Sequence, residues 1–486
     1  MSEKMEEMGK TGSKYDVIII GAGIGGLTCG SYLAKAGKKV LICEQQSKPG
    51  GCCTSFKRDE FTFEASIHWL SGLGKGKFIY KILEELEIQD KIEFIRFDPV
   101  YRLIGKDFEL VLSSDIAKFE EDLVSMFPAE RKSIHKLISK CASIAKHPLK
   151  MLRYMKKTNE EIIDPLFRDQ KLKKILYRLM PPKYSLSNQI GMVSKGDYRY
   201  PKKGTSQALS NLLAETFQAN GGDLSLNTMV NKILIENGVA RGVELPNGEQ
   251  IKASYVISNG DARLTFLKLV GKEWLSEEFI KELKREVCAS LFLVSLGMDL
   301  DLKETRFGGE MIHYILDLDE LETSDPNKCP IELIIYSNRD PSLAPPGKST
   351  VAIAAGIPYD YMNKWKSEDG ERGEEYRKLK EEVADHLIKT AENVIPGLSE
   401  HIVCKDIATP LTYERYTLNS KGSMMGWDPT PENMRKMFKM RKQDTPIKNL
   451  YQVGHWTFPG GGVPTVMISG KNCAKQVLRK SKKERM

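Results

Sequence analysis

The chain has 486 residues, which is enough for two or three domains and a large core. Its 41% hydrophobic and 28% charged residues are ordinary for a soluble globular protein. The nine cysteines are an odd number scattered along the chain, which argues against a disulfide framework and suits free thiols in a reducing compartment. No His/Cys cluster has the spacing of metal ligands, so no metal site is predicted.

The start of the chain is polar. Residues 1–14 lack the apolar core of a secretory signal and are expected to form a flexible tail. A membrane span needs about 20 mostly apolar residues, and the best candidate, residues 17–36, is interrupted by glycines and polar residues. We therefore expect a cytoplasmic protein without a signal peptide or a transmembrane helix.

The net charge of +8 is concentrated in one region. Residues 131–174 hold thirteen Lys or Arg and four acidic residues, a local charge of +9. A basic helical face beside apolar residues can lie on an anionic membrane surface, so peripheral membrane contact through residues 131–174 is one interpretation. A solvated helix face is the other. Nucleic acid is not an expected partner, because the sequence has no aromatic platform or recognised binding module.

A dinucleotide-binding pattern opens the structured part of the chain. Residues 17–20 form an apolar run, glycines follow in G-x-G-x-x-G spacing, residues 24–36 suit a helix, and residues 40–43 form a second apolar run. Such a βαβ unit places a pyrophosphate at the helix N-terminus. An acid at the tip of the second strand binds the ribose hydroxyls. The predicted cofactor-binding residues here are Gly21, Gly23, Gly25, Gly26 and Glu44.

The roles of the glycines differ. Gly21 permits the tight turn, Gly23 lets the backbone approach the pyrophosphate, and Gly26 lets the helix pack close to the strand. A lone glycine motif is weak support for a cofactor site. Here the strand before, the helix after, the second strand and the acid at its tip all agree, and a glycine-rich turn in an ordinary α/β domain would not need the glutamate.

A second glycine pair follows the second strand. The combination of GAGIGGL, Glu44, Pro49-Gly50-Gly51 and Thr54 resembles the FAD-binding start of the flavoprotein group that includes amine oxidases and phytoene desaturases. The resemblance implies that Gly50 and Gly51 line the pyrophosphate and that the Thr54 hydroxyl bonds a phosphate. Cys52 and Cys53 are interpreted as small buried residues; a redox pair of adjacent cysteines would be strained.

The segment that follows carries the one candidate for catalysis. Residues 61–70 end in Ile67-His68-Trp69-Leu70, which is similar to a stretch in retinol saturases and, more loosely, in carotenoid isomerases. His68 is a weak candidate for moving a proton near the flavin or the substrate. A structural histidine is the alternative.

The middle of the chain alternates between two kinds of pattern. Residues 100–104 and 108–112 predict a hairpin, and residues 117–179 predict a long helical region. A helix is expected over 206–218. A β-meander is expected over 229–235, 239–245 and 250–257, joined by two Asn-Gly turns. By resemblance, Val230 lies where a backbone group contacts the adenine.

Beyond residue 262 the pattern again departs from a dinucleotide fold. Apolar runs at 291–296, 331–335 and 351–355 suggest strands, buried on both faces or facing an apolar substrate tunnel, and 371–394 suggests an amphipathic helix. No second strand–GxGxxG–helix unit is visible. A separate NAD(P) domain is therefore not expected, and NAD(P) would serve only as a transient electron partner.

The last motif spans residues 450–464. A short strand leads to glycines and then to a helix expected over 464–478, whose positive end can point at the flavin ring. The family usually has Gly-Asp where this chain has Gly454-His455, so the contact made by the acid is altered. By resemblance, the flavin-binding residues at this end are Gly454, His455, Gly462, Val463 and Pro464.

The predicted fold is α/β. It comprises a discontinuous Rossmann-like FAD-binding domain of the GR2 flavoprotein type (residues 15–75, 200–261 and 443–480) with an inserted α+β substrate domain (76–199 and 262–442). The resemblance covers nearly the full length and is specific at both cofactor ends. It is to the group of phytoene desaturases, carotenoid isomerases and all-trans-retinol 13,14-reductases (retinol saturases).

That resemblance implies an FAD-dependent oxidoreductase acting on carbon–carbon double bonds of an apolar polyene or isoprenoid lipid, carotenoid-like or retinoid-like. Saturation and desaturation both stay open. The alternatives are a cis–trans carotenoid isomerase using reduced flavin, an FAD amine oxidase, and a non-enzymatic escort protein that binds prenyl lipids.

Overall fold

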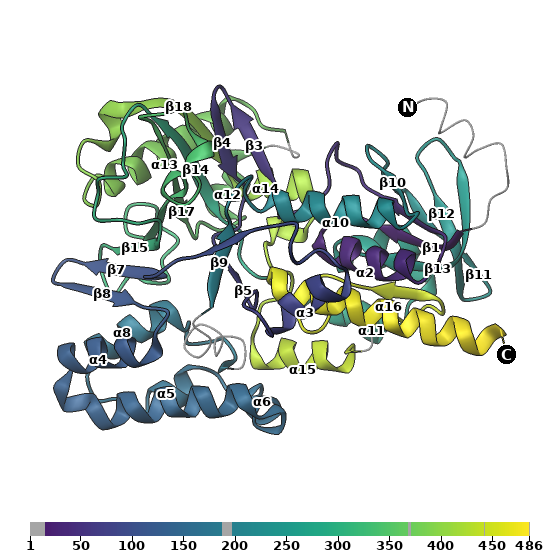
Figure 1. Ribbon diagram of the computed structural model, residues 1–486, viewed down its shortest axis with the longest axis horizontal. Helices are drawn as coiled ribbons and strands as arrows, with labels where there is room; N and C mark the ends of the chain where they lie inside the picture. The colour runs from purple at the N-terminus through teal and green to yellow at the C-terminus, as the bar shows by residue number, and fades with distance from the viewer. Residues whose placement is uncertain (1–14, 187–196, 368–370, 442, 486) are drawn as a thin grey trace.

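The structure is a computed structural model that describes residues 15–186, 197–367, 371–441 and 443–485. The tail expected at residues 1–14 lies outside the described residues. Figure 1 shows two β-sheet regions side by side, with a group of helices below one of them.

The right-hand sheet has seven strands in the order β10-β2-β1-β13-β12-β11, with β19 also paired to β13. Strands β10, β2, β1, β13 and β19 run parallel, and β11 to β13 form the predicted antiparallel meander. The Rossmann-like architecture is thereby confirmed. The strands are β1 (Tyr15–Ile20), β2 (Val40–Cys43), β10 (Asp223–Ser225), β11 (Lys232–Glu236), β12 (Val239–Glu244), β13 (Gln250–Ser258) and β19 (Leu450–Gln452).

Strand β1 is apolar throughout its centre because both of its faces are covered. Val17 and Ile19 pack with helices α2 (Ile24–Lys35), α10 (Gln207–Ala219) and α16 (Val463–Arg485), while Ile18 packs against the meander on the other face. Figure 1 shows the three helices along the same side of this sheet. Helix α16 is longer than the predicted 464–478, because residues 479–485 contain no helix breaker.

The left-hand sheet also has seven strands, in the order β18-β14-β17-β16-β15-β7-β8. Its outer hairpin comes from residues near 100, as predicted, and its other strands come from residues 292–408. These two distant segments meet where β15 runs parallel to β7. The strands are β7 (Tyr101–Gly105), β8 (Phe108–Leu112), β14 (Phe292–Met298), β15 (Met311–Ile315), β16 (Ile331–Ile335), β17 (Ser349–Ala355) and β18 (Ile402–Ala408).

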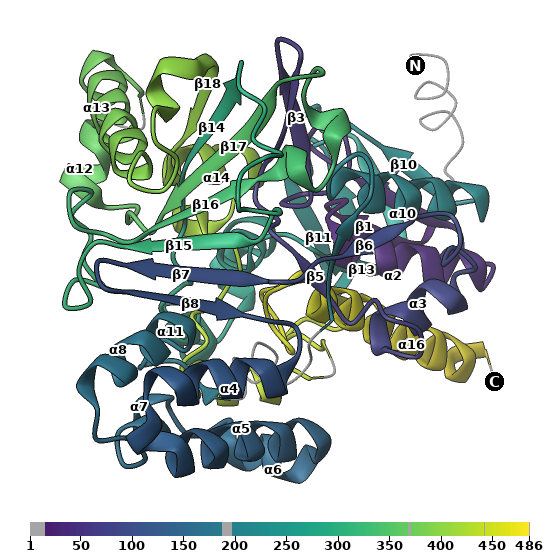
Figure 2. The same cartoon turned by 60° about the vertical axis from the view of Figure 1, so that its left-hand side comes forward.

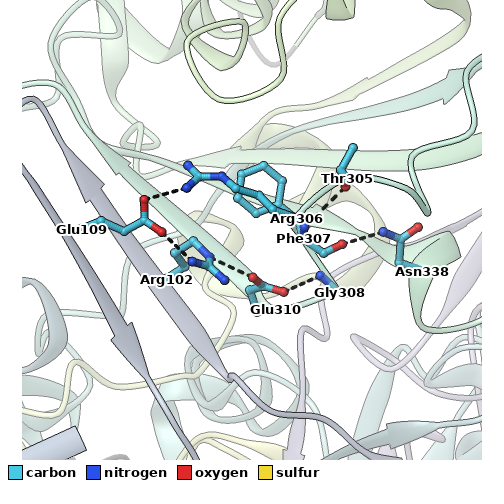
Figure 3. Close-up of polar contacts among 8 residues, drawn as sticks. All are labelled: Arg102, Glu109, Thr305, Arg306, Phe307, Gly308, Glu310 and Asn338. Atoms are coloured by element: carbon cyan, nitrogen blue, oxygen red, sulfur yellow. Dashed lines mark hydrogen bonds and ion pairs between the residues drawn. The ribbon is translucent and has the colours of Figure 1, made fainter. Parts of the chain in front are cut away.

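An ion-pair group reinforces this junction (Figure 3). The guanidinium of Arg102 on β7 pairs with Glu109 on β8 and, at 2.9 Å, with Glu310 just before β15. Glu310 also accepts a hydrogen bond of 2.8 Å from the backbone N–H of Gly308. Arg306 pairs with the second oxygen of Glu109 at 2.8 Å. The polar contacts therefore tie the hairpin to the loop that leads into β15.

The predicted helical region over residues 117–179 is confirmed as several separate helices below the β7–β8 hairpin, as both Figure 1 and Figure 2 show. Asp115 and Asp169 cap two of them by accepting backbone N–H bonds. No helix in the described ranges is long and apolar enough to cross a membrane. The helices are α4 (Ile116–Met126), α5 (Arg131–Lys146), α6 (Pro148–Tyr154), α7 (Glu160–Ile163) and α8 (Gln170–Leu179).

Two small sheets connect the larger parts, and the sequence did not predict them. They are the hairpin β3 (Ser55–Arg58) and β4 (Phe61–Glu64), and the sheet β5 (Leu70–Ser71), β9 (Tyr198–Pro201) and β6 (Phe94–Arg96). Their strands are too short to show a clear alternation. The remaining helices are α3 (Phe78–Glu85), α11 (Glu277–Glu282), α12 (Tyr361–Lys366), α13 (Glu374–Ala391), α14 (Pro410–Thr417) and α15 (Pro431–Lys439).

Candidate functional site

One cavity of about 1440 Å³ lies between the two large sheets. It exceeds the roughly 300–1,000 Å³ of a typical small-molecule site, so it has room for a cofactor and a second ligand. The candidate His68 lines it, and so do all but one of the predicted cofactor-binding residues. These lining residues are Gly21, Gly23, Gly25, Glu44, Gly50, Gly51, Thr54, Val230, Gly454, His455, Gly462, Val463 and Pro464.

The exception is Gly26, whose surroundings explain why it is a glycine. A β-carbon at Gly26 would lie 2.3 Å from the carbonyl oxygen of Gly21 and 3.2 Å from Cβ of Asn259. The start of helix α2 therefore sits directly against the turn that precedes it. This position suits the predicted packing role and explains why Gly26 is not part of the cavity lining.

The first glycine loop has no room for side chains, but it borders the cavity and can contact a ligand. Gly21 has a φ of +95°, which favours glycine. A β-carbon at Gly23 would lie 2.6 Å from Nδ2 of Asn259, and one at Gly25 would lie 3.1 Å from the backbone of Gly454. The N-terminus of the twelve-residue helix α2 follows and offers free N–H groups and a positive dipole. This geometry fits a pyrophosphate.

Glu44 is held in place at the end of β2. Its Oε2 accepts a 2.7 Å hydrogen bond from the N–H of Ala22, and its Oε1 accepts a 2.9 Å bond from the N–H of Gln46. Burial raises the pKa of Glu44, and these backbone bonds oppose that effect. The carboxylate is only 7% exposed and borders the cavity, so it is oriented to accept further bonds from ribose hydroxyls.

The second glycine loop lies against the first. Gly50 and Gly23 form an isolated parallel bridge, and Gly50 has a φ of +131°. A β-carbon at Gly50 would lie 2.3 Å from the carbonyl oxygen of Cys53. The Thr54 hydroxyl donates a 2.7 Å bond to Oε1 of Gln207, so its proton is already used. Thr54 lines the cavity, and its bond to a phosphate stays a prediction.

The C-terminal motif completes the same cavity. Gly454 and Gly462 have φ values of +90° and +93°, and α16 begins at Val463. Nε2 of His455 lies 3.4 Å from Oδ1 of Asn419. Burial lowers the pKa of His455 to about 4, so the imidazole is neutral at pH 7. The chain therefore carries a neutral group at the position where the resemblance implied a carboxylate in related proteins.

The position of His68 determines its tautomer. Nδ1 of His68 lies 2.9 Å from the hydroxyl of Tyr336, which itself donates a 3.0 Å bond to the carbonyl of Ile67. Since the Tyr336 proton is used there, Nδ1 of His68 is the donor and Nε2 carries the lone pair. Burial lowers the pKa of His68; Glu332 opposes this effect and Arg339 adds to it.

Two lining residues were not identified from the sequence as site residues. Asn259 follows β13 and places its side chain beside Gly23 and Gly25. Glu332 lies in the middle of β16 and faces the cavity. The only signal for Glu332 in the sequence is that it is a single acid within the apolar run IELII. That run predicts a strand and not a site.

The fold and the site together define a dinucleotide-binding flavoprotein. The chain belongs to the flavin containing amine oxidoreductase family, whose match spans residues 24–478. The glycine loops that a β-carbon would obstruct, and the buried Glu44 at the end of β2, fit the phosphates and ribose of FAD. FAD is the cofactor, and the chain is an FAD-dependent oxidoreductase, as predicted.

Three curated relatives match over most of their length. The chloroplastic prolycopene isomerase of Daucus carota is 29% identical, with 96% of this chain and 80% of the relative covered. The 4,4'-diapophytoene desaturase (4,4'-diapolycopene-forming) of Methylomonas sp is 26% identical, with 96% and 95% covered. The all-trans-retinol 13,14-reductase of Danio rerio is 25% identical, with 90% and 82% covered. The resemblance inferred from the motifs is thereby confirmed.

Solved structures share the fold. An oxidoreductase from Methanosarcina mazei superposes with a TM-score of 0.66 at 20% identity, covering 94% of this chain and 99% of that one. A double mutant of putrescine oxidase superposes with a TM-score of 0.67 at 15% identity, covering 96% and 99%. At these identities the comparison concerns the fold alone.

Proposed function

We propose that the chain moves a hydride between FAD and a carbon–carbon bond of an apolar polyene or isoprenoid lipid, by saturation or desaturation. One observation carries the proposal. A single cavity joins the glycine loops to a region lined by apolar side chains of the second sheet and the segment before it, including Leu291, Leu293, Met311 and Ile407. The names of the relatives, which include a desaturase and a retinol reductase, support the same substrate class.

Bound FAD would supply the hydride acceptor or donor. We propose that the two glycine loops, Glu44 and the backbone at Val230 hold its ADP part, and that Gly454, His455 and residues 462–464 hold the flavin part. The surrounding protein excludes water from the lipid. We also propose residues 15–75, 200–261 and 443–480 as the FAD domain and the two intervening segments as the substrate domain.

We propose that His68 moves the proton that accompanies the hydride. Its bare Nε2 makes it a base, and its lowered pKa keeps it neutral at pH 7. In a desaturation, Nε2 takes a proton from the carbon next to the one that loses hydride. In a saturation the same nitrogen first takes a proton from solvent and then gives it to the carbon next to the one that gains hydride. An exchange with no net redox change would make the chain an isomerase, the activity named for one relative.

The purified protein provides a direct test. Anaerobic mixing with candidate polyenes should bleach the flavin absorption if the lipid is desaturated. Reduced protein mixed with the same lipids should regain it if they are saturated. A shift of double-bond geometry with unchanged absorption would identify the isomerase. A colourless folded protein, or a coloured one that reacts only with amines, would overturn the proposal in favour of the escort protein or the amine oxidase.

A His68→Gln variant tests the proton role. Its flavin content should match that of the unsubstituted protein while turnover falls about 10²–10⁴-fold, the usual contribution of general acid–base catalysis. In the unsubstituted protein the acid limb of the pH–rate profile should lie below pH 6.5, because burial lowers the pKa of His68. His401→Gln, at an exposed histidine paired with Asp299, is the control. Normal turnover by His68→Gln would remove the residue from the mechanism.

We further propose a cytoplasmic enzyme that docks on anionic membranes through helices α5 and α6, with NAD(P) at most a transient electron partner. Leu149 is 82% exposed there, between exposed Lys146 and Lys150. The lysines of α8 instead pair with acids, as Lys171 does with Asp107 at 2.6 Å. An exposed leucine flanked by cations suits an interface of lipid headgroups.

Sedimentation with phosphatidylserine-containing vesicles tests this surface. Burying one leucine contributes about 1.5–3 kcal/mol, so Leu149→Asp should weaken vesicle binding by roughly tenfold or more. Val403→Asp, at a half-exposed apolar residue of β18, is the matched control. Equal binding by both variants, or binding that does not depend on anionic lipid, would refute the docking surface.

A further inference from the structure

The apolar part of the cavity contains a buried charge. Glu332 is the one acid in strand β16, between Ile331 and Leu333, and it lines the cavity. Its Oε1 accepts a 2.7 Å bond from the guanidinium of Arg178 on α8. The Glu332 side chain is 19% exposed, and because it lines the cavity this accessible part faces the space that the substrate would occupy.

A histidine without partners stands beside this carboxylate. His313 on β15 pairs directly with Glu332 across the two strands, so both side chains lie on the same face of the sheet. Nδ1 of His313 is 3.5 Å from Oε1 of Glu332, which is too far for a good hydrogen bond. His313 is 4% exposed, and neither of its ring nitrogens has a hydrogen-bond partner within the described residues. Buried polar atoms normally have partners, so His313 is an exception among the buried polar residues of this sheet.

The charges in this group follow from the surroundings. Burial raises the pKa of Glu332, while charges on His313, Arg178 and His68 lower it, and the net shift is downward. Because both histidines are neutral at pH 7, the ion pair with Arg178 is what keeps the carboxylate ionised there. Burial and Arg178 lower the pKa of His313 to about 3, against the effect of Glu332. The group therefore holds one ion pair and a neutral imidazole. An ionised carboxylate that faces an apolar cavity is costly unless the ligand supplies a hydrogen bond.

A donor completes the arrangement. Tyr101 on β7 also lines the cavity, and its ring lies 5.1 Å from that of His313. Its hydroxyl accepts a 2.7 Å bond from Nε1 of Trp69 and keeps its own O–H as a donor. Glu332 is close enough to raise the pKa of Tyr101, after burial and Tyr198. Tyr101 pairs with Met311, two residues before His313, so the side chains of Tyr101 and Glu332 lie on one face of the sheet. The cavity thus presents an acceptor, Glu332, and a donor, Tyr101, on that face.

We propose that Glu332 and Tyr101 bind a hydroxyl group at the end of the lipid, so that the preferred substrate is a polyene or isoprenoid alcohol and not a hydrocarbon. This inference rests on the proposed function and assigns the polar end of the same cavity. The alcohol O–H donates to Glu332 and its oxygen accepts from Tyr101. A carboxylic acid does not fit, because its charge would face the carboxylate of Glu332.

A matched series of lipids tests the site. All-trans-retinol, the hydrocarbon with a methyl group in place of its CH₂OH, and the corresponding acid are compared by anaerobic flavin kinetics and by titration of the flavin spectrum. We expect kcat/KM to favour the alcohol over the hydrocarbon by about tenfold to a hundredfold, the worth of a hydrogen bond to a charged group. Glu332→Gln and Tyr101→Phe should each bring this ratio towards one.

The control variant carries the same Glu→Gln substitution at a different residue. Glu310→Gln also removes a buried carboxylate from an arginine pair, just before β15 of the same sheet, yet Glu310 contacts Arg102 and Gly308 (Figure 3). This variant should retain the preference for the alcohol. If Glu310→Gln loses the preference as Glu332→Gln does, the effect is structural and the hydroxyl site is overturned.

The outcomes separate this inference from the proposed function. Equal kcat/KM and equal affinity for the alcohol and the hydrocarbon would overturn the hydroxyl site while leaving polyene redox chemistry intact. A preference for the acid would also overturn it and would point to Arg178 as the anchor. If no member of the series binds or reacts, the proposed function and the hydroxyl site fail together.

Discussion

The packing of Gly26 makes the most direct prediction about the cofactor site. In Gly26→Ala the new β-carbon would start 2.3 Å from the carbonyl oxygen of Gly21, where contacts shorter than about 3 Å do not persist. The oxygen belongs to the backbone and the β-carbon is fixed directly to the backbone of α2, so helix α2 or the Gly21 turn must shift. Overpacking of this kind costs about 1–3 kcal/mol. The shift moves the N–H groups that face the phosphates, and the same energy corresponds to roughly a fivefold to 150-fold weaker FAD affinity.

Fluorescence titration of the apoprotein with FAD measures this loss, and thermal unfolding reports the stability. The control is Gly30→Ala, one turn further along α2. Its β-carbon would meet Cδ1 of Ile42 at 2.8 Å and the ring of Phe217 at 3.2 Å, both of them side chains that can repack. Gly30→Ala should keep the FAD affinity of the unsubstituted protein. An unchanged affinity in Gly26→Ala would refute the reasoning that the glycine loop is fixed by close backbone packing.

Further predictions concern charge. Glu44→Gln should weaken FAD binding by about tenfold in the same titration, because an amide NH₂ would face the N–H of Ala22 or Gln46 in place of an acceptor. The free energy of unfolding should keep its full value above pH 6.5. As the pH is lowered it should fall by up to about 1.4 kcal/mol per pH unit for each buried histidine, because the unfolded chain is protonated first. This loss of stability continues down to about pH 4 for His455 and about pH 3 for His313, the pKa values of the two imidazoles in the folded protein. Urea unfolding from pH 7 to pH 4 measures it, and a flat profile would contradict the neutral burial of both imidazoles.

The cofactor end could be predicted from the sequence because its signals are local. A glycine loop, two apolar runs and an acid fall within 30 residues of each other. The Asn237-Gly238 turn predicts a hairpin by itself. The order of the helices and strands there follows from the spacing alone. Helix α16 shows the limit of this approach, since a solvated, charged end carries no signal for where a helix stops.

The second sheet could not be predicted in the same way. Its strand β7 pairs with β15, about 200 residues later, and the register of Tyr101 with Met311 has no trace in either segment. β15 itself, MIHYI, is short and carries a histidine in its middle, so it was not predicted as a strand. Pairing at such a distance is decided by packing of the whole sheet and not by local propensity.

The polar end of the cavity could not be predicted for the same reason. Glu332 and His313 interrupt apolar strands, and from the sequence each looks like an irregularity in a core element. Only the β15–β16 register places them opposite each other, and only the position of α8 brings Arg178 to them. A charged residue within a buried strand therefore indicates a functional site, because burying a charge without a partner is costly.

The neutral His455 gives the cofactor site a charge balance of its own. FAD brings a negatively charged pyrophosphate, and helices α2 and α16 both begin at this cavity with their positive ends. Glu44 is the acid predicted at the ribose, and its oxygens are already held by two backbone N–H groups. A second carboxylate at residue 455 would add like charge in a buried place, where charges are weakly screened. With a histidine whose pKa is about 4, the cavity at pH 7 lacks that charge, so at residue 455 no carboxylate counters the positive ends of the two helices.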